Sequence, residues 1–154
     1  MTFLLDSNIF IARFDPTDVH HKRCKALVDR ALAGKFDVVA PSLVLTEIAV
    51  GLNRRTKNPE FARDTYRRLW AHPNMRWLDV TVERAVDAAE FGIAASIRGG
   101  ADTIIAYVAK SEGIPLVTLD QLLRDQIGDR SLRCRPKNSP TPQSTSKRRP
   151  FDRA

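Results

Sequence analysis

Near its N-terminus the chain reads Phe3-Leu4-Leu5-Asp6-Ser7-Asn8-Ile9-Phe10-Ile11-Ala12, a stretch in which two kinds of local structure follow each other directly. The apolar run from Phe3 to Leu5 predicts a short buried strand. Polar residues then interrupt the run, and the apolar residues from Ile9 to Ala12 predict a helix. The stretch therefore predicts a strand that passes straight into a helix, as in an α/β fold.

The rest of the sequence continues this alternation. Further strands are expected at residues 37–40, 76–80 and 116–119, and further helices at about residues 18–33, 43–54, 59–71, 81–98 and 101–112. Ser42 and Thr81 are the expected N-caps of two of these helices. Short strands alternating with helices predict a three-layer α/β/α fold, with a short central parallel sheet flanked by helices. In such sheets, ligands bind at the carboxyl ends of the strands.

The composition is that of a soluble globular protein. The chain has 154 residues, enough for one domain, and 43% of them are hydrophobic and 28% charged. No apolar run approaches the roughly 18 residues of a membrane span, and the N-terminus lacks the features of a secretory signal. We therefore expect a cytoplasmic protein without a membrane segment, whose cysteines, Cys24 and Cys134, are free thiols.

The net charge of +7 is concentrated at the C-terminus. Residues 131–154 contain seven Lys and Arg and one Asp, whereas residues 1–130 have a net charge of +1. Beyond residue 130 the sequence is rich in Pro, Ser, Thr, Lys and Arg, which is typical of a disordered basic segment. We therefore expect a folded domain at residues 1–130 and a basic tail at residues 131–154. Such a tail favours a polyanionic partner.

Four carboxylates occupy positions from which they could converge. Asp6 and Asp120 each follow an apolar strand, so both are expected at the carboxyl edge of the sheet. Asp102 falls in the first turn of the helix that follows Gly99-Gly100, where the helix dipole favours an anion. Glu47 lies within an otherwise apolar helical segment, and a charge packed there needs a partner.

Each acid also has an ordinary structural interpretation. Asp6 and Asp120 could cap the segments that follow them, and Asp102 could be a simple first-turn acid. Glu47 could pair with a nearby arginine. Taken together, however, the four acids have no buried cation in their own segments to neutralise them, and clustered carboxylates raise one another's pKa. A bound divalent cation resolves this repulsion, and all-oxygen ligands favour Mg²⁺ or Mn²⁺ over zinc.

The motifs around these acids resemble those of the PIN domain, specifically of VapC-type toxins. They are Leu4-Leu5-Asp6-Ser7-Asn8, Thr46-Glu47-Ile48, Ala101-Asp102-Thr103-Ile104-Ile105-Ala106 and Val117-Thr118-Leu119-Asp120. Their order and spacing match the family over residues 1 to about 130. The resemblance implies a PIN-like nuclease domain with four catalytic metal ligands, namely Asp6, Glu47, Asp102 and Asp120. It also implies that Asn8 and Thr118 give these ligands polar support.

The resemblance further implies an activity and partners. The activity is that of a Mg²⁺- or Mn²⁺-dependent endoribonuclease that hydrolyses RNA phosphodiester bonds and, as a toxin, inhibits translation or growth. The partners are an RNA substrate, a cognate VapB-type antitoxin and a second copy of the chain in a homodimer. Because the nucleophile in this chemistry is water, the products should carry a 3′-hydroxyl and a 5′-phosphate.

A basic run spans a turn and a helix. It contains four possible RNA contacts, namely Arg54, Arg55, Arg67 and Arg68. A solvated helix face is the alternative interpretation of this run. Trp70 and Trp77 could stack on bases, but their apolar neighbours favour core or dimer contacts.

A second weak pattern is formed by His20, His21 and Cys24, whose helical spacing could hold zinc. No fourth ligand lies nearby in the sequence, which favours a buried Cys24 and partly exposed histidines.

Three other functions compete with a toxin nuclease. A phosphatase of the haloacid dehalogenase type also has an aspartate after its first strand, but it needs a second acid two positions later, where this chain has Asn8. A non-catalytic module that binds RNA or a partner is disfavoured by the presence of all four acids. A housekeeping RNA-processing nuclease of the same fold is left open, and a neighbouring gene for an antitoxin would distinguish it from a toxin.

Overall fold

The computed structural model describes residues 1–128 and 131–133. The strands are β1 (Thr2–Leu5), β2 (Asp37–Pro41), β3 (Met75–Leu78), β4 (Leu116–Thr118) and β5 (Ser131–Arg133). The helices are α1 (Ser7–Phe14), α2 (His21–Leu32), α3 (Leu43–Thr56), α4 (Pro59–Trp70), α5 (Val82–Ala95), α6 (Gly100–Ser111) and α7 (Gln121–Ile127). Their order confirms the predicted alternation of strands and helices.

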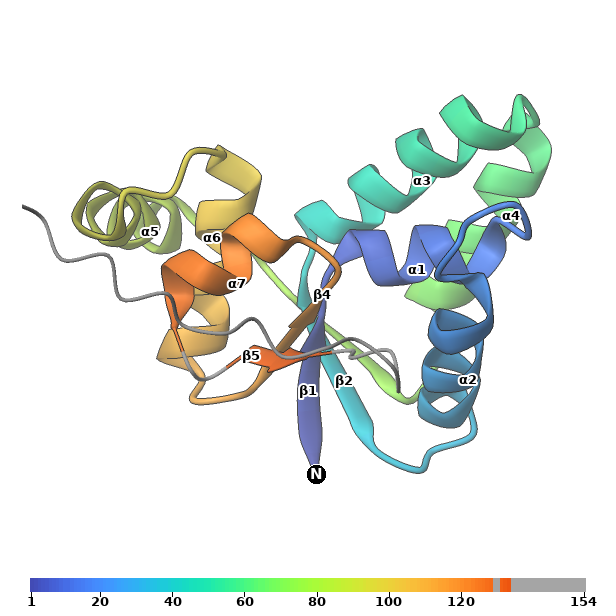
Figure 1. The fold of residues 1–154 in the computed structure, drawn as a ribbon, viewed down its shortest axis with the longest axis horizontal. Coiled ribbons are helices and arrows are strands. Elements are labelled where there is room, and N and C mark those ends of the chain that lie inside the picture. The colour runs from blue at the N-terminus through green and yellow to red at the C-terminus, as the bar shows by residue number, and fades with distance from the viewer. Residues whose placement is uncertain (129–130, 134–154) are drawn as a thin grey trace, which may run out of the picture.

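The strands form one parallel sheet with the order β3-β2-β1-β4-β5. Helices α1 to α4 lie on one side of the sheet, and α5 to α7 lie on the other (Figure 1). The three-layer α/β/α fold expected from the sequence is therefore confirmed. The chain reverses direction across the sheet after β3, so β1 and β4 become neighbours although they are far apart in the sequence.

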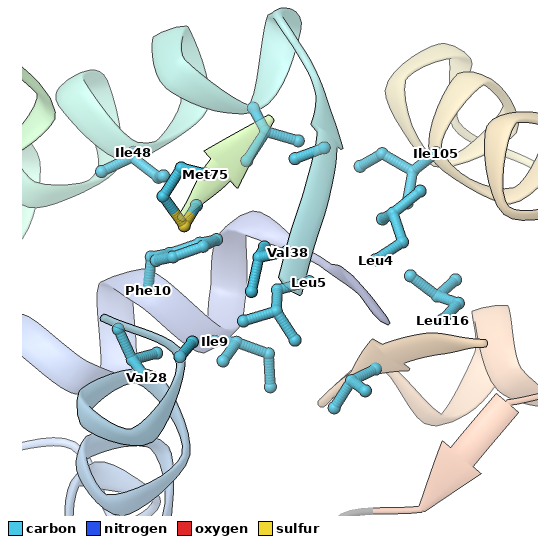
Figure 2. Packing of buried hydrophobic residues seen from close by; sticks show 14 of the residues in the cluster. Leu4, Leu5, Ile9, Phe10, Val28, Val38, Ile48, Met75, Ile105 and Leu116 are labelled. Atoms are coloured by element: carbon cyan, nitrogen blue, oxygen red, sulfur yellow. The ribbon is translucent and has the colours of Figure 1, made fainter. Parts of the chain in front are cut away.

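The central strand β1 is buried on both of its faces. Leu4 points toward Ile105 of α6, whereas Leu5 points toward Ile9 of α1 (Figure 2). These four side chains are fully buried. Because successive strand residues face opposite sides of a sheet, the apolar pair Leu4-Leu5 anchors helices from both outer layers.

The two predicted helix N-caps, Thr81 and Ser42, differ in the structure. The Thr81 hydroxyl accepts a hydrogen bond from the Arg84 amide at 3.2 Å, which confirms this N-cap. Ser42 occupies the predicted N-cap position of α3, but its backbone is helical and its side chain makes no capping hydrogen bond. Its amide is instead used to extend the sheet, donating to the Leu78 carbonyl at 2.8 Å.

The C-terminal part of the described chain adds a strand that we did not predict. Residues 131–133, which we assigned to the basic tail, pair with β4 in a parallel register from Leu116↔Ser131 to Thr118↔Arg133. The expected tail from residue 134 onward, including Cys134, lies outside the described residues. Within the described residues, no helix combines the length and apolar character required to cross a membrane.

Candidate active site

The carboxyl edge of the sheet brings together the ends of β1 and β4. Their pairing, Leu5↔Val117, places the following residues side by side. The Asp6 amide donates to the Val117 carbonyl at 3.0 Å, which continues the ladder by one residue. The first and last of the four acids, Asp6 and Asp120, therefore emerge from neighbouring strands at one edge, as the sequence predicted.

Asp6 is held by the two polar residues predicted to support it. The Asn8 amide nitrogen donates to Asp6 Oδ2 at 2.6 Å and to Thr118 Oγ1 at 2.9 Å, and the Thr118 hydroxyl also donates to Asp6 Oδ2. The Asn8 side-chain oxygen accepts from the Leu119 amide at 3.1 Å. Asn8 and Thr118 thus join the two strand ends and orient the Asp6 carboxylate.

This position also perturbs the acidity of Asp6. Its residue is only 4% exposed, and burial raises the pKa of its carboxyl group. Hydrogen bonds from Thr118 and Ser7 act in the opposite direction, and the charge of Asp102 adds to the rise in pKa. The net direction is upward, so the ionised form of Asp6 is destabilised in the absence of a cation.

Glu47 reaches the same edge because α3 runs beside α1 in a matching register. The Ser7 side chain lies close enough to Glu47 to lower the pKa of its carboxyl group, and four residues further along both helices Ile11 meets Gly51. A β-carbon at Gly51 would lie 2.5 Å from Ile11 Cδ1, so the glycine permits this close approach. The register therefore places Glu47 beside the residue that follows Asp6.

The Glu47 carboxylate lacks the partner that its position requires. Its Oε2 atom is buried and has no hydrogen-bond partner in the described residues. Burial raises the pKa of Glu47, a hydrogen bond from Ser7 lowers it, and the charges of Asp6 and Asp102 raise it further. The suggested ion pair between Glu47 and an arginine is absent from the described part of the chain.

Asp102 lies in the first turn of α6, as predicted, and its carboxylate folds back over Gly99. A β-carbon at Gly99 would lie 2.5 Å from Asp102 Oδ2. Burial raises the pKa of Asp102, and the charge of Asp120 raises it further. Since Asp102 also raises the pKa values of Asp6 and Glu47, it links the four acids electrostatically.

Asp120 has a capping role in addition to its place at the edge. Its Oδ1 atom accepts a hydrogen bond from the Leu123 amide at 3.0 Å, so it caps α7. The ordinary structural interpretation thus holds for Asp120, whereas the Asp6 side chain makes no capping hydrogen bond to α1. One Asp120 oxygen is used in this cap.

The acids have no cationic partner among the described residues. None of the ion pairs found there involves Asp6, Glu47, Asp102 or Asp120. In residues 1–128 and 131–133, no three His, Cys, Asp or Glu side chains form a ready-made metal site. The four acids are therefore neighbours that repel one another, but they do not form a closed coordination shell.

Sequence reasoning missed Arg124, which supports the end of β4. Its guanidinium donates to the Thr118 carbonyl at 3.0 Å and to the Gln121 side chain, and its Nε atom is buried without a partner. The only sequence signal for it is its position four residues after Asp120. Arg124 thus places a positive group next to the edge without forming an ion pair there.

The four predicted RNA contacts differ in their surroundings. Arg55 donates to Asp15 at 3.1 Å and to Asp18 at 2.7 Å, so its guanidinium already has two partners. Arg54, Arg67 and Arg68 are exposed.

The other weak sequence patterns have clear outcomes. Trp70 is 63% exposed and is therefore not a core residue, whereas Trp77 is partly buried and packs against the core. Cys24 is buried, and His21 contacts the Ala12 carbonyl at 3.0 Å. The burial of Cys24 agrees with its structural interpretation.

Comparisons with known proteins agree with this architecture. The PIN domain family matches residues 3–126, and the chain belongs to that family. No curated protein matches the chain in sequence.

Solved structures with the same fold come from several bacterial proteins. One is VapC20 of Mycobacterium tuberculosis, a sarcin–ricin loop cleaving toxin, with a TM-score of 0.67, 22% identity, and coverage of 79% of this chain and 92% of that one. FitAcB of Neisseria gonorrhoeae has a TM-score of 0.58 and 20% identity, with coverage of 82% and 93%. VapBC2 of Rickettsia felis, bound to promoter DNA, has a TM-score of 0.56 and 21% identity, with coverage of 78% and 89%. At these identities the likeness concerns the fold.

Proposed function

We propose that this protein is a divalent-metal-dependent endoribonuclease and the toxin of a toxin–antitoxin pair. The observation that carries the proposal is the group of four acids at the carboxyl edge, which have no cationic partner in the described residues. Burial and neighbouring carboxylates raise the pKa values of three of them, Asp6, Glu47 and Asp102. Such an arrangement costs free energy unless a cation binds there during function. Membership of the PIN domain family supports a nuclease.

The donor set suits Mg²⁺ or Mn²⁺. The ligands would be four carboxylates, namely Asp6, Glu47, Asp102 and Asp120. All of them offer hard oxygen donors, and the buried Glu47 Oε2 atom has no other partner in the described chain. When bound, the ion would neutralise the scissile phosphate and increase the acidity of water.

The chain's own residues would divide the remaining tasks. Asn8 and Thr118 hold Asp6 through its Oδ2 atom, which suits Asp6 for a fixed ligand role. Asp102 has no hydrogen-bonded side-chain partner among the described residues, so a carboxylate oxygen of Asp102 would be available to accept the proton of the attacking water. The water oxygen would bond to phosphorus as the bond to the 3′ oxygen breaks. The 3′ oxygen would take up a proton from solvent, which leaves a 3′-hydroxyl and a 5′-phosphate.

The proposed partners are RNA in the cytoplasm, a VapB-type antitoxin and a second copy of the chain. The structural neighbours include VapBC2 bound to promoter DNA, which supports an antitoxin partner. A homodimer is supported by α5, where three large apolar side chains are exposed, namely Val82 (76%), Val86 (57%) and Ile93 (75%). Positions 82, 86 and 93 lie on one face of a helix, as an unpaired interface would require.

Replacing Asp102 with Asn tests the metal site. We expect Asp102→Asn to weaken Mn²⁺ binding, measured by calorimetry, and to abolish cleavage of a labelled RNA. Asp64→Asn is the matched control, because Asp64 is exposed on α4, away from the site. Unchanged cleavage by Asp102→Asn, or full activity of the natural protein in excess chelator, would refute the metal-dependent mechanism.

Growth tests whether the nuclease acts as a toxin. Expression of the natural chain alone should arrest growth, and expression of Asp6→Ala at equal protein level should not. A housekeeping nuclease would be tolerated in both forms. Equal arrest by both forms would show that toxicity does not come from this site.

A further inference from the structure

One flank of α3 leads away from the acids and is open to solvent. We define the outer flank of α3 as Glu47, Val50 and Arg54. Arg54 follows Glu47 by seven residues, which in an α-helix places it within about 20° of the same side and about 10.5 Å further along the axis. Helix α3 begins near the carboxyl edge of the sheet and runs outward beside α1 (Figure 1). Arg54 therefore stands just outside the acidic edge.

The outer flank is not covered by other described parts of the chain. Val50, between Glu47 and Arg54, is 62% exposed, and Arg54 is exposed as well. Arg54 takes part in no side-chain hydrogen bond or ion pair within residues 1–128 and 131–133. Its guanidinium is free to bind a ligand.

The neighbouring arginine has a different environment. Arg55 lies about 100° further around α3, where it donates to Asp15 and Asp18 of the loop between α1 and α2. These contacts use its charge within the protein. Two adjacent arginines, indistinguishable in the sequence, thus have different chemical roles available to them.

The chemistry of the substrate explains why a free cation is needed at Arg54. Each phosphate of an RNA strand is repelled by the four acids, so affinity must come from positive groups next to the acidic edge. A guanidinium donates two parallel hydrogen bonds to phosphate oxygens and keeps its charge. Contacts of this kind set the register of a strand without reading its bases.

We propose that Arg54 binds a backbone phosphate of single-stranded RNA next to the scissile phosphate and so positions the strand on the outer flank of α3, and that Arg55 makes no such contact. This assignment rests on the proposed ribonuclease function, because it takes the acidic edge as the place of cleavage. Arg54 contributes to binding and register, whereas the acids carry out the cleavage.

Binding measurements can test the assignment without cleavage. The full chain carrying Asp102→Asn is titrated with a fluorescently labelled, mixed-sequence single-stranded oligoribonucleotide at several salt concentrations. Adding Arg54→Gln should weaken affinity about tenfold at low salt, as expected when a charged hydrogen bond is removed. It should also reduce the salt slope by roughly 0.7, the value for one phosphate on a single strand. Arg54→Lys should restore most of the slope, because it keeps the charge.

Lys35→Ala is the matched control. Lys35 is exposed in the turn before β2, at the opposite edge of the sheet, and its removal lowers the net charge by the same amount. It should leave both affinity and slope unchanged. The assignment is overturned if Arg54→Gln binds like its parent, if Lys35→Ala has the same effect, or if Arg54→Lys fails to restore the slope.

Cleavage by the natural chain separates this inference from the proposed function. If the natural chain cleaves no RNA in Mn²⁺ while Arg54 still controls RNA affinity, the proposed ribonuclease function fails and the phosphate contact stands. If the natural chain cleaves RNA and Arg54→Gln changes neither KM nor the salt slope, only the contact fails.

Discussion

Position 8 distinguishes this site from that of a phosphatase, because this chain has the amide Asn8 where the phosphatase needs an acid. An aspartate there could not donate to Asp6 Oδ2 and would add a fifth negative charge, whereas Asn8 donates to Asp6 and to Thr118. The residue that excluded the phosphatase in the sequence is thus also the one that orders the strand ends. A single nitrogen atom connects β1 to β4 at the edge where the acids gather.

Gly99 and Gly100 provide a residue-scale test of the site. Gly99 has an extended backbone that alanine also adopts, but an added β-carbon would lie 2.5 Å from Asp102 Oδ2, whereas nothing lies within 4 Å of the same atom at Gly100. Gly99→Ala should therefore displace the Asp102 carboxylate and reduce cleavage by about tenfold to a hundredfold, with little change in stability. Gly100→Ala should retain activity. Equal RNA cleavage rates for both variants would contradict this prediction.

At the scale of elements, the site depends on the register of two helices. Helices α1 and α3 meet at four-residue intervals, through Ser7 and Glu47, Ile11 and Gly51, and Asp15 and Arg55. The spacing matches one helical turn, so the helices run side by side in the same direction. The ion pair between Asp15 and Arg55 at one end of the two helices and the contact of Ile11 with Gly51 in the middle thus hold Glu47 in place at the other end.

The ion pairs at the far end of these helices predict a pH dependence of stability. Hydrogen bonds from Thr17 and Arg55 lower the pKa of Asp15 by more than burial raises it. For Asp18, burial is the largest single effect and raises the pKa, but the hydrogen bonds from the His20 amide and Arg55 together with their charges lower it by more. Lowered pKa values stabilise the fold above about pH 4, and this stabilisation disappears as pH falls through the folded pKa values.

We therefore predict that Arg55→Met lowers the free energy of unfolding at pH 7 by about 1 kcal/mol or less, because the pair is partly exposed. The difference from the natural protein should shrink toward zero as the pH falls through the lowered pKa values of Asp15 and Asp18 and the carboxylates become protonated. Urea unfolding at several pH values measures it. Arg54→Met is the control, since its effect should not depend on these two acids. A pH-independent effect of Arg55→Met would count against the assigned role.

The exposed apolar side chains of α5 lead to a second prediction, which concerns the oligomeric state. Its exposed apolar face should lie in the homodimer interface, so Val86→Arg should place a charge there and convert dimer to monomer. Light scattering after gel filtration measures the change. Leu122→Arg is the control, because Leu122 is 48% exposed on α7 and outside this face. A natural protein that is monomeric, or a Val86→Arg protein that still dimerises, would exclude the interface.

At the scale of the whole molecule, charge is distributed unevenly. Residues 1–130 have a net charge of +1 although they contain the four acids of the site, so the rest of this part totals +5. Residues 131–154 add +6. A positive total outside the four acids suits an enzyme that must bind a phosphate strand at the place where it holds cations.

The basic tail predicts a contribution to RNA affinity. Deletion of residues 135–154 removes a net charge of +5 but leaves β5 intact. Affinity for a single-stranded RNA should fall, and the salt slope should flatten by roughly 0.7 for each phosphate that the tail neutralises in the full chain. Turnover at saturating RNA should stay the same, because the four acids are outside the deletion. Superimposable affinities and slopes for both chains would show that the tail does not bind RNA.

Local sequence was enough to predict the layers of the fold and the positions of two acids. The apolar runs Leu4-Leu5 and Leu116-Val117 each end at polar residues and so predicted short buried strands, and parallel connection rules then place Asp6 and Asp120 at one edge. The strand β5 escaped this reasoning because Ser131–Arg133 has no apolar signal of its own. Its hydrogen bonds come from β4, a partner that local sequence does not identify.

The tertiary structure alone distinguishes Arg55 from Arg54 and makes Trp70 an exposed residue. Both outcomes depend on how a helix is rotated about its axis, and this rotation is set by packing against distant residues, such as Ile11 against Gly51. A rotation of about 100° separates neighbouring helix positions, so one packing contact decides which arginine meets Asp15 and which faces solvent. Local pattern specifies which elements form, whereas long-range packing specifies which of their side chains meet.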